Sequence, residues 1–520
     1  MMIANFYKKA SAEQILVTLS LIGMLVACWI MYIQQGWIND DSVLYFEAAR
    51  LFSIGEWKSG LALFEWPLYS LLIAGLHVAT TLNIQLCAQL LNAVFIVIVM
   101  SSLLRIILLA GGDKLTLLMA TLLFLSTAYI VGDVVPMLLR DQGFWAFMLT
   151  ALVFLIRFYR NAQLSDAIYW QLFAITALLF RIEAITYIVV LPLILLTLPN
   201  TALKDKFLRF CKANAINIFI CLVASIAAVI HGSIGISNFG RVQEIFSAFS
   251  DIQNNFSMQI VSKAQVMANS VLGEPLENFA WMSLMLTFIS IAAIKCISVA
   301  GWLAPILVYL NYKSIKLVMA NDVAKILALC GLVVFINAVL IILRANILTS
   351  RYVIFFGFIS IIFAAFAMVS LYQKWQRKQL GGLEKFVSIF ATIVILLSIA
   401  LNVMPKHAGY NYQKEAVDFV KTQNVERKSV FYVSPRARFY AGAAYLDRGY
   451  DYWKFTEKAI ADGSIYQHDY LVINLDINEK TAEREAVLAA ELTDYELVKI
   501  FYGYKKKKRM LVYKKAQHAG

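Results

Sequence analysis

Residues 14–34 read QILVTLSLIGMLVACWIMYIQ, and shortly afterwards residues 37–50 read WINDDSVLYFEAAR. The first stretch is an almost unbroken apolar run of about 20 residues, which is the length that a helix needs to cross a bilayer. It follows two lysines and has no clear small-residue cleavage site, so we predict a retained membrane anchor rather than a signal peptide. The second stretch places two adjacent carboxylates, Asp40 and Asp41, where the chain leaves the membrane.

The whole chain has a composition typical of a membrane protein. Of its 520 residues, 61% are hydrophobic and only 15% are charged, whereas soluble proteins carry about 25% charged residues. Long unbroken apolar runs favour membrane-spanning helices over a β-barrel. The formal net charge of +13 is accounted for by basic residues held at one membrane face, so no nucleic-acid partner is predicted. The six cysteines lie in or beside apolar runs, so neither a disulfide framework nor a metal-binding spacing is expected.

About eleven runs are predicted to cross the membrane: 14–34, 84–108, 115–131, 142–157, 165–180, 184–198, 214–233, 281–311, 326–343, 352–372 and 385–403. Basic residues gather in alternate loops, and the positive-inside rule places those loops and the N-terminus in the cytoplasm. This predicts a C-terminus outside. The run 281–311 contains Lys295 and Pro305. We interpret it as one span, because two spans would reverse every later loop.

Three outer segments are too long to be simple turns. Residues 35–83 form a first loop with helical patterns at 42–53 and 66–80, and residues 234–280 form a polar, amphipathic loop. The transmembrane domain is predicted to cover residues 1–404, followed by a charged α/β domain at 405–520. Its predicted strands are 428–433, 469–475, 495–503 and 509–514, its predicted helices are 411–423, 452–461 and 479–491, and KKKKR at 505–509 is interpreted as a hairpin turn or solvated edge.

Charged groups at the outer membrane boundary are costly unless they are solvated or paired, which makes them candidates for a functional site. Those predicted at this face are Asp40, Asp41, Asp133, Arg140, Asp141, Arg181, Glu183, Arg241, Arg344 and Arg351. Each also has a structural interpretation. Asp40 or Asp41 would cap the helix that begins near Ser42, and Arg181 with Glu183 would form an internal ion pair. Arg351 would anchor lipid headgroups. The sequence leaves these alternatives open.

The order of these motifs resembles that of GT-C type glycosyltransferases that use polyprenyl-phosphate sugars, including protein O-mannosyltransferases and lipid A aminoarabinose transferases. The shared features are an acid four residues before an aromatic residue (Asp41 to Tyr45), then WPLYSLLIAGL (66–76), LLRDQGFWAFML (138–149), RIEAITYIVVLP (181–192) and Arg351-Tyr352. Ile182 stands where relatives frequently have proline, which leaves the subfamily open. The resemblance covers residues 10 to about 400 and implies a GT-C-like helical fold.

The resemblance also implies roles for individual residues. Asp41 would be the general base that deprotonates an acceptor hydroxyl. The cation for the donor's phosphate would be Arg351, with Arg241 and Lys58 as further candidates. The other residues expected to bind substrate are Asp40, Arg140, Asp141, Arg181, Glu183 and Tyr352. Displacement assisted by one base would invert the anomeric centre. No cofactor is required by this chemistry, and a divalent metal stays an open alternative because some relatives use one.

The partners implied are a polyprenyl-phosphate sugar donor, a lipid, glycan or protein acceptor, and the inner (plasma) membrane itself. The main competing hypothesis is a transporter or lipid flippase, for which broken helices, mid-membrane charges and internal repeats would be expected. A membrane-anchored binding or scaffolding protein is a further alternative. It would predict that the acid of the first outer loop is dispensable.

Overall fold

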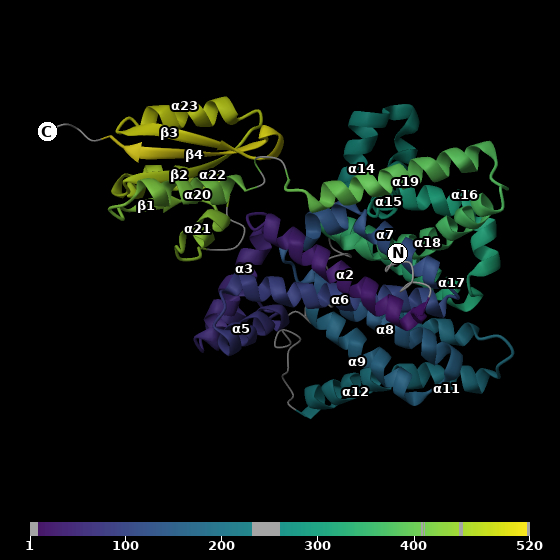
Figure 1. The fold of residues 1–520 in the computed structure, drawn as a ribbon. Coiled ribbons are helices and arrows are strands. Elements are labelled where there is room, and N and C mark those ends of the chain that lie inside the picture. The colour runs from purple at the N-terminus through teal and green to yellow at the C-terminus, as the bar shows by residue number, and fades with distance from the viewer. Residues whose placement is uncertain (1–8, 231–259, 407–408, 410, 447–450, 517–520) are drawn as a thin grey trace. The chain divides into compact units, whose positions relative to one another are not determined.

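The computed structural model describes residues 9–230, 260–406, 409, 411–446 and 451–516. The chain divides into two compact units (Figure 1). The first, here the helical unit, comprises Met1–Cys28, Leu90–Val135 and Arg140–Asn402. The second, here the loop-and-sheet unit, comprises Trp29–Gln89, Pro136–Leu139 and Val403–Gly520. The predicted first outer loop and the predicted C-terminal domain therefore belong to one unit.

The helical unit is built almost entirely from apolar helices. The long helices α2 (Ala12–Ile33) and α6 (Ile84–Leu109) contribute to both units. The other helices are α7 (Lys114–Leu125), α8 (Asp141–Asn161), α9 (Leu164–Phe180), α10 (Ala184–Val190), α11 (Leu203–Ala213), α12 (Ala215–Ile230), α14 (Val261–Met267), α15 (Ala280–Ser298), α16 (Leu303–Val318), α17 (Asn321–Ala345), α18 (Ile354–Gln376) and α19 (Gly382–Val403). Short π or 3-10 segments lie at Ala128–Val134, Val135–Met137, Leu191–Thr197, Ala268–Leu272, Glu274–Phe279 and Ser350–Val353.

Seven helices among the residues described are long and apolar enough to span a membrane, which confirms a polytopic helical membrane protein. An eighth arises if α7 and the following segment Ala128–Met137, bent by 56°, form one broken span. Apolar helices too short for that test are Leu68–Thr80, Leu164–Phe180 and Ala184–Thr197. The number of long apolar helices is lower than the eleven spans predicted. The hydropathy of a sequence detects every apolar run, but it does not show whether the helix that the run forms is continuous, bent or short.

The predicted span 281–311 is corrected to two helices, α15 and α16. Gly301 between them has a φ of +86°, in the left-handed region that ends helices. Pro305 lies in the first turn of α16, where its missing N–H removes no intrahelical hydrogen bond. Val299, after the end of α15, packs against Gly357 near the start of α18. Just beyond the C-terminal end of α16, the Ala320 N–H donates a hydrogen bond to Ala110 O at 2.9 Å. The helix α16 therefore crosses from the start of α18 to the turn after α6.

The first outer loop contains three helices: α3 (Asp40–Ser53), α4 (Trp57–Leu63) and α5 (Leu68–Thr80). The first and third confirm the helical patterns predicted there, whereas α4 was not predicted. The ring of Tyr45 on α3 packs edge-on against Tyr69 of α5, with 5.4 Å between centroids. Eight of the fourteen residues of α3 are buried, so this loop is a packed structure. Of the predicted outer loop 234–280, residues 234–259 lie outside the described part, and the remainder is helical except at Gly273.

The C-terminal segment forms the predicted α/β domain. Its strands are β1 (Val430–Tyr432), β2 (Tyr470–Asp476), β3 (Tyr495–Tyr502) and β4 (Lys508–Lys515), in the order β1-β2-β4-β3. Strands β1 and β2 are parallel, and the other pairs are antiparallel. The helices are α20 (Tyr412–Gln423), α21 (Pro435–Ala441), α22 (Tyr452–Ala461) and α23 (Thr481–Glu491). All four predicted strands and all three predicted helices are confirmed. KKKKR forms the predicted turn between β3 and β4, and α21 is an addition.

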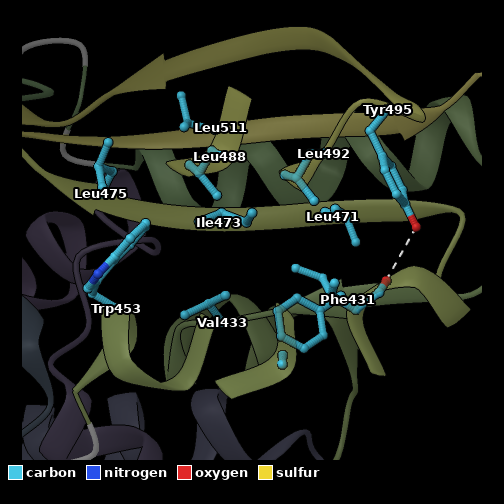
Figure 2. Packing of buried hydrophobic residues seen from close by; sticks show 12 residues of the cluster. Phe431, Val433, Trp453, Leu471, Ile473, Leu475, Leu488, Leu492, Tyr495 and Leu511 are labelled. Atoms are coloured by element: carbon cyan, nitrogen blue, oxygen red, sulfur yellow. Dashed lines mark hydrogen bonds between the residues drawn. The ribbon is translucent and has the colours of Figure 1, made fainter. Parts of the chain in front are cut away.

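Side chains of β2 alternate between two hydrophobic cores because successive residues of a strand point to opposite faces. Leu471, Ile473 and Leu475 pack with α22 and α23 in the core shown in Figure 2. There Tyr495 donates a hydrogen bond to Ile465 O at 3.3 Å. Residues Tyr470 and Val472 face α20 and α21 instead. A sheet covered on both faces explains why β2 reads as a continuous apolar run.

Candidate functional site

The acidic pair lies in the first turn of α3, but neither aspartate caps that helix. Asn39 is the cap: its side chain accepts a hydrogen bond from Asp41 N–H at 2.9 Å. Ser42 Oγ reciprocates by accepting from Asn39 N–H at 3.3 Å. The hypothesis that Asp40 or Asp41 is the cap is therefore wrong. With Asn39 in that role, neither carboxylate is needed as the cap, and both lie at the end of the helix where the dipole favours negative charge.

Asp40 is held by two side chains from the C-terminal domain. Arg436 Nε on α21 donates to Asp40 Oδ1 at 2.8 Å, and Tyr452 OH on α22 donates to Asp40 Oδ2 at 2.9 Å. Burial alone would lower the pKa of Arg436, but the charge of Asp40 and neighbouring tyrosines outweigh it and raise that pKa. Tyr440 also donates to Gln35 O at 2.8 Å. Both oxygens of Asp40 thus accept hydrogen bonds from the C-terminal domain.

Asp41 is half-buried on a helix whose orientation is fixed on several sides. Ser42 Oγ, the next side chain, donates to Met137 O. One turn further on, Tyr45 is 4% exposed and packs against Tyr69, whose hydroxyl donates to Leu138 O at 3.1 Å. Phe46 contacts Phe439 of α21, with 5.2 Å between ring centroids. A carboxylate on such a supported helix has a defined direction, which a general base needs.

A second charged group lies in the helical unit. Arg181, at the end of α9, forms two hydrogen bonds with Glu183, of 3.1 and 2.6 Å, and an ion pair with Asp141 at the start of α8. Its guanidinium lies 4.6 Å from the centre of the Tyr352 ring. Burial would raise the pKa of Glu183, but the charge and hydrogen bonds of Arg181 lower it to about 2, and Arg140 contributes in the same direction. The sequence-predicted residues Arg140, Asp141, Arg181, Glu183 and Tyr352 therefore do come together.

This second group is mainly a structural ion cluster around Arg181. Arg181 and Asp141 are 6% and 2% exposed, so their charges are compensated by each other rather than by water. The internal ion-pair interpretation of Arg181 and Glu183 is thus confirmed. Arg351 lies next to this cluster, 5.8 Å from the centre of the Tyr352 ring, and is only partly buried. Of these cations, Arg351 is the more accessible to a ligand.

Other predicted residues have different positions. Lys58 lies exposed on α4 in the loop-and-sheet unit, whereas Arg351 belongs to the helical unit. Arg241 lies outside the described residues. Within the part of the chain that the structure describes, no group of three or more His, Cys, Asp or Glu side chains could hold a metal ion.

Lys295 is a residue that the sequence pattern did not place in the site. It lies in the last turn of α15, and its ammonium donates to Ser350 Oγ at 3.4 Å, immediately before Arg351. Its neighbours Cys296 and Ile297 line an apolar cavity of about 660 Å³ between α15, α16, α17 and α18. The sequence indicated a function for Lys295 in one way: a charged side chain in an apolar run is energetically unfavourable in a membrane.

The Asp40 contacts make a direct prediction. Replacing Arg436 with glutamine is expected to increase the amide exchange rates of residues 38–46 by about 10-fold, because the ion pair and the bond to Ile38 O at 3.4 Å are both lost. Hydrogen exchange measured by mass spectrometry on the full-length protein tests this. The matched control is Arg427→Gln, which removes an exposed arginine of the same domain. Unchanged exchange in Arg436→Gln would show that the C-terminal domain does not hold this loop.

Comparison with known proteins adds a fold relationship. No model of a known protein family matches the chain, and no curated protein sequence matches it. Among solved structures, ArnT from Cupriavidus metallidurans in the apo state matches with a TM-score of 0.55. The match covers 96% of this chain and 98% of that one, at 11% sequence identity. This chain has an ArnT-like fold.

The ArnT-like fold confirms the resemblance inferred from the motifs, at the level of architecture. The match covers nearly all of both chains, so it includes the C-terminal α/β domain, which the motif resemblance over residues 10 to 400 did not reach. At 11% identity the likeness concerns the fold, and the roles of individual side chains must be argued from their own geometry.

Proposed function

We propose that this protein is a membrane glycosyltransferase that moves a sugar from a polyprenyl-phosphate donor to an acceptor hydroxyl at the outer face of the membrane. The observation that carries the proposal is the position of Asp41. It is a partly exposed carboxylate on a capped, packed helix in an ArnT-like fold, and its neighbour Asp40 is fixed by Arg436 and Tyr452.

In the proposed reaction Asp41 is the general base. Its carboxylate takes the proton of the acceptor hydroxyl while that oxygen forms a bond to the anomeric carbon. The bond between the anomeric carbon and the phosphate oxygen breaks, and the lipid phosphate leaves with the electron pair. Attack opposite the leaving group inverts the anomeric centre. Asp40 contributes by positioning, because both of its oxygens already accept hydrogen bonds.

The leaving phosphate needs positive charge, and the helical unit offers two cations close in the fold. Lys295 contacts Ser350, and Arg351 is the next residue along the chain. The adjoining apolar cavity of about 660 Å³ suits an isoprenoid chain, because it is lined almost wholly by aliphatic and aromatic side chains. We propose that Lys295 and Arg351 bind the phosphate while this cavity holds part of the lipid.

The proposed orientation has a cytoplasmic N-terminus and a C-terminal domain outside the inner membrane. Among the described residues, α2 is the helix that precedes Asp40, and Asp40 contacts Arg436. With α2 crossing the membrane, this contact would put the C-terminal domain on the side opposite the N-terminus, which is the orientation proposed here. The basic residues in the loops before residue 281 support this orientation by the positive-inside rule.

The decisive experiment follows radiolabelled sugar from synthetic polyprenyl-phosphate hexose and pentose donors into the lipids, glycans and proteins of membranes that contain the full-length protein. Transfer above that of membranes lacking the protein is the expected result. Movement of the donor across the bilayer without transfer would contradict the proposal and support a flippase.

The same assay tests the phosphate site. Lys295→Met is expected to raise the KM for the donor about 10-fold, because a hydrogen bond to a charged group is lost. The acceptor KM should change little. Lys316→Met, an exposed lysine of α16, serves as the matched control. A donor KM that is the same in wild type and Lys295→Met would remove Lys295 from the phosphate site.

A further inference from the structure

The C-terminal domain contains a polar cavity of about 350 Å³, distinct from the apolar cavity of the helical unit. This sheet-edge cavity is lined by Asp451, Tyr452, Trp453, Asn474, Asp476, Asn478 and Arg484. Its volume falls within the range of about 300–1,000 Å³ that small-molecule sites occupy. None of these residues was identified as a candidate by the sequence motifs.

The topology of the sheet explains why a ligand site would form there. Strands β1 and β2 are parallel, so their carboxyl ends meet at one edge of the sheet. Asn474 and Asp476 end β2 at that edge, and the N-terminal turn of α22 supplies Tyr452 and Trp453. In α/β sheets, ligands bind preferentially outside the carboxyl ends of parallel strands. The cavity thus occupies the position where this architecture gathers loops and side chains.

The side chains of the cavity are held in defined orientations. Asn474 is 3% exposed, and its amide oxygen accepts a hydrogen bond from Tyr412 OH at 3.2 Å. Trp453 Nε1 donates to Glu457 at 2.5 Å, and the guanidinium of Arg484 lies 5.2 Å from the centre of the indole ring. A rigid arrangement of polar groups lowers the entropic cost of binding a polar ligand.

One acceptor atom of the cavity is unsatisfied. Asp476 Oδ1 is enclosed, and the described residues provide no hydrogen-bond donor to it. The ammonium of Lys508 approaches the same oxygen at 3.6 Å, which is an ion pair but too long for a hydrogen bond. A buried acceptor without a donor is costly. The Asp476 side chain as a whole is 47% exposed, so a ligand hydroxyl can donate to this carboxylate and offset that cost.

The lining chemistry selects a neutral, hydroxyl-rich ligand. The lining carboxylates Asp451 and Asp476 are balanced by Arg484 and by Lys508, which pairs with Asp476, so the cavity has no excess positive charge to favour a phosphate or another anion. A carboxylate can accept hydrogen bonds from two neighbouring hydroxyls of a sugar. A primary amide can accept a hydrogen bond from one hydroxyl and donate a hydrogen bond to the next. Trp453 is 9% exposed and has the Arg484 guanidinium over its ring, so it forms a fixed wall of the cavity.

The cavity is also connected to the acidic loop. Tyr452 lines it, and the hydroxyl of the same residue donates to Asp40 Oδ2 at 2.9 Å. Asp40 precedes the candidate base directly. A ligand in the cavity would therefore contact a side chain that positions the residue beside Asp41.

We propose that the sheet-edge cavity binds a neutral pyranose ring of the acceptor, which is thereby a glycan. This assignment of the acceptor rests on the proposed function, while the binding site itself does not. The group that binds the sugar is formed by Asp476, Asn474 and Asn478. Tyr452 is a positioning residue between this group and Asp40.

Binding is tested with the full-length protein in lipid nanodiscs, because alkyl maltoside detergents themselves carry sugar. The probes are the methyl glycosides of mannose, glucose, galactose, N-acetylglucosamine and rhamnose, observed by saturation-transfer NMR. At least one should give a saturable signal that inorganic phosphate does not reduce. Asp476→Asn should weaken its dissociation constant at least 10-fold. The matched control Asp418→Asn, which changes an exposed aspartate of α20, should leave the constant within twofold.

Each alternative result has a defined meaning. Absence of a signal from all five glycosides, or equal affinity in Asp476→Asn and wild type, overturns the proposal. Displacement of the sugar by phosphate would contradict the neutral-ligand assignment. A folding defect is excluded if the thermal unfolding midpoint of Asp476→Asn matches that of the Asp418→Asn control.

The same titration on Asp41→Asn protein separates this inference from the proposed function. Sugar binding should be unchanged there, because Asp41 does not line the cavity. If wild-type protein binds the glycosides through Asp476 but transfers no sugar, the proposed function fails and the binding site stands. If transfer occurs, Asp476→Asn should raise the acceptor KM at least 10-fold with the donor KM unchanged.

Discussion

Asp41→Asn is expected to reduce sugar transfer by about 10²–10⁴-fold, the range that positioned general bases contribute. Asparagine keeps the size of the side chain but cannot accept the proton of the attacking hydroxyl. The substitution should not disturb the fold, because Asn39 is the helix cap and the Asp41 backbone N–H that it binds is retained. The expected signature is a lower kcat with little change in the donor KM.

The matched control for Asp41 is Glu47→Gln, which changes a partly buried acid two turns further along α3 that is paired with Arg50 at 2.7 Å. Its kcat should stay within about twofold of wild type, because Arg50 is 49% exposed and ion pairs at the surface contribute about 0–1 kcal/mol. Transfer assays on protein of equal thermal stability measure both. An Asp41→Asn variant with wild-type kcat would exclude Asp41 as the base and leave the acidic loop with a structural role.

Arg181→Met is expected to lower the free energy of unfolding by about 3–5 kcal/mol, the cost of removing one partner from a buried ion pair. Asp141 and Glu183 would both lose their buried countercharge. The low pKa of Glu183 depends on Arg181. In wild type this stabilisation is present above the ordinary carboxyl pKa and is lost as the pH falls toward 2. In the variant the deficit should shrink as the pH is lowered from 8 to 5, because Glu183 takes up a proton.

Thermal unfolding in nanodiscs at both pH values measures this effect. Arg105→Met is the control, since that arginine is 41% exposed and pairs with the exposed Glu13; its loss should cost less than about 1 kcal/mol. The triple variant Arg181→Met, Asp141→Asn and Glu183→Gln should recover much of the stability, because no buried charge then lacks a partner. An Arg181→Met variant as stable as wild type would show that the cluster is solvated.

The prediction of the C-terminal domain from sequence succeeded because its signals are local. Strand β2 is a seven-residue apolar run that lies between two helices packed on both faces of the sheet. The helical patterns in the first outer loop are equally local. In contrast, α4 is only seven residues long and carries exposed hydrophobic residues, such as Trp57. Too few residues of α4 face a core for a periodic pattern to be recognised.

The candidate site was only partly predictable, because its decisive contacts are long-range. The motif resemblance identified Asp41, and the charges at 140–141 and 181–183 do meet. Arg436 could not be found, because nothing in the sequence pairs it with an acid 396 residues away. Likewise, Lys295 was recognised as an unusual charge, but its contact with Ser350 joins residues 55 positions apart, which a hydropathy profile does not show.

The bond between Asp40 and Arg436 also orders events during biosynthesis. Asp40 is synthesised 396 residues before its partner, which corresponds to about 20–80 s of translation at 5–20 residues per second. During that interval α3 has its own cap but lacks the guanidinium and the phenol that fix Asp40. A nascent chain thus carries the acidic loop through the insertion of every later helix without these contacts. The loop acquires them only after the last domain has been made and has folded.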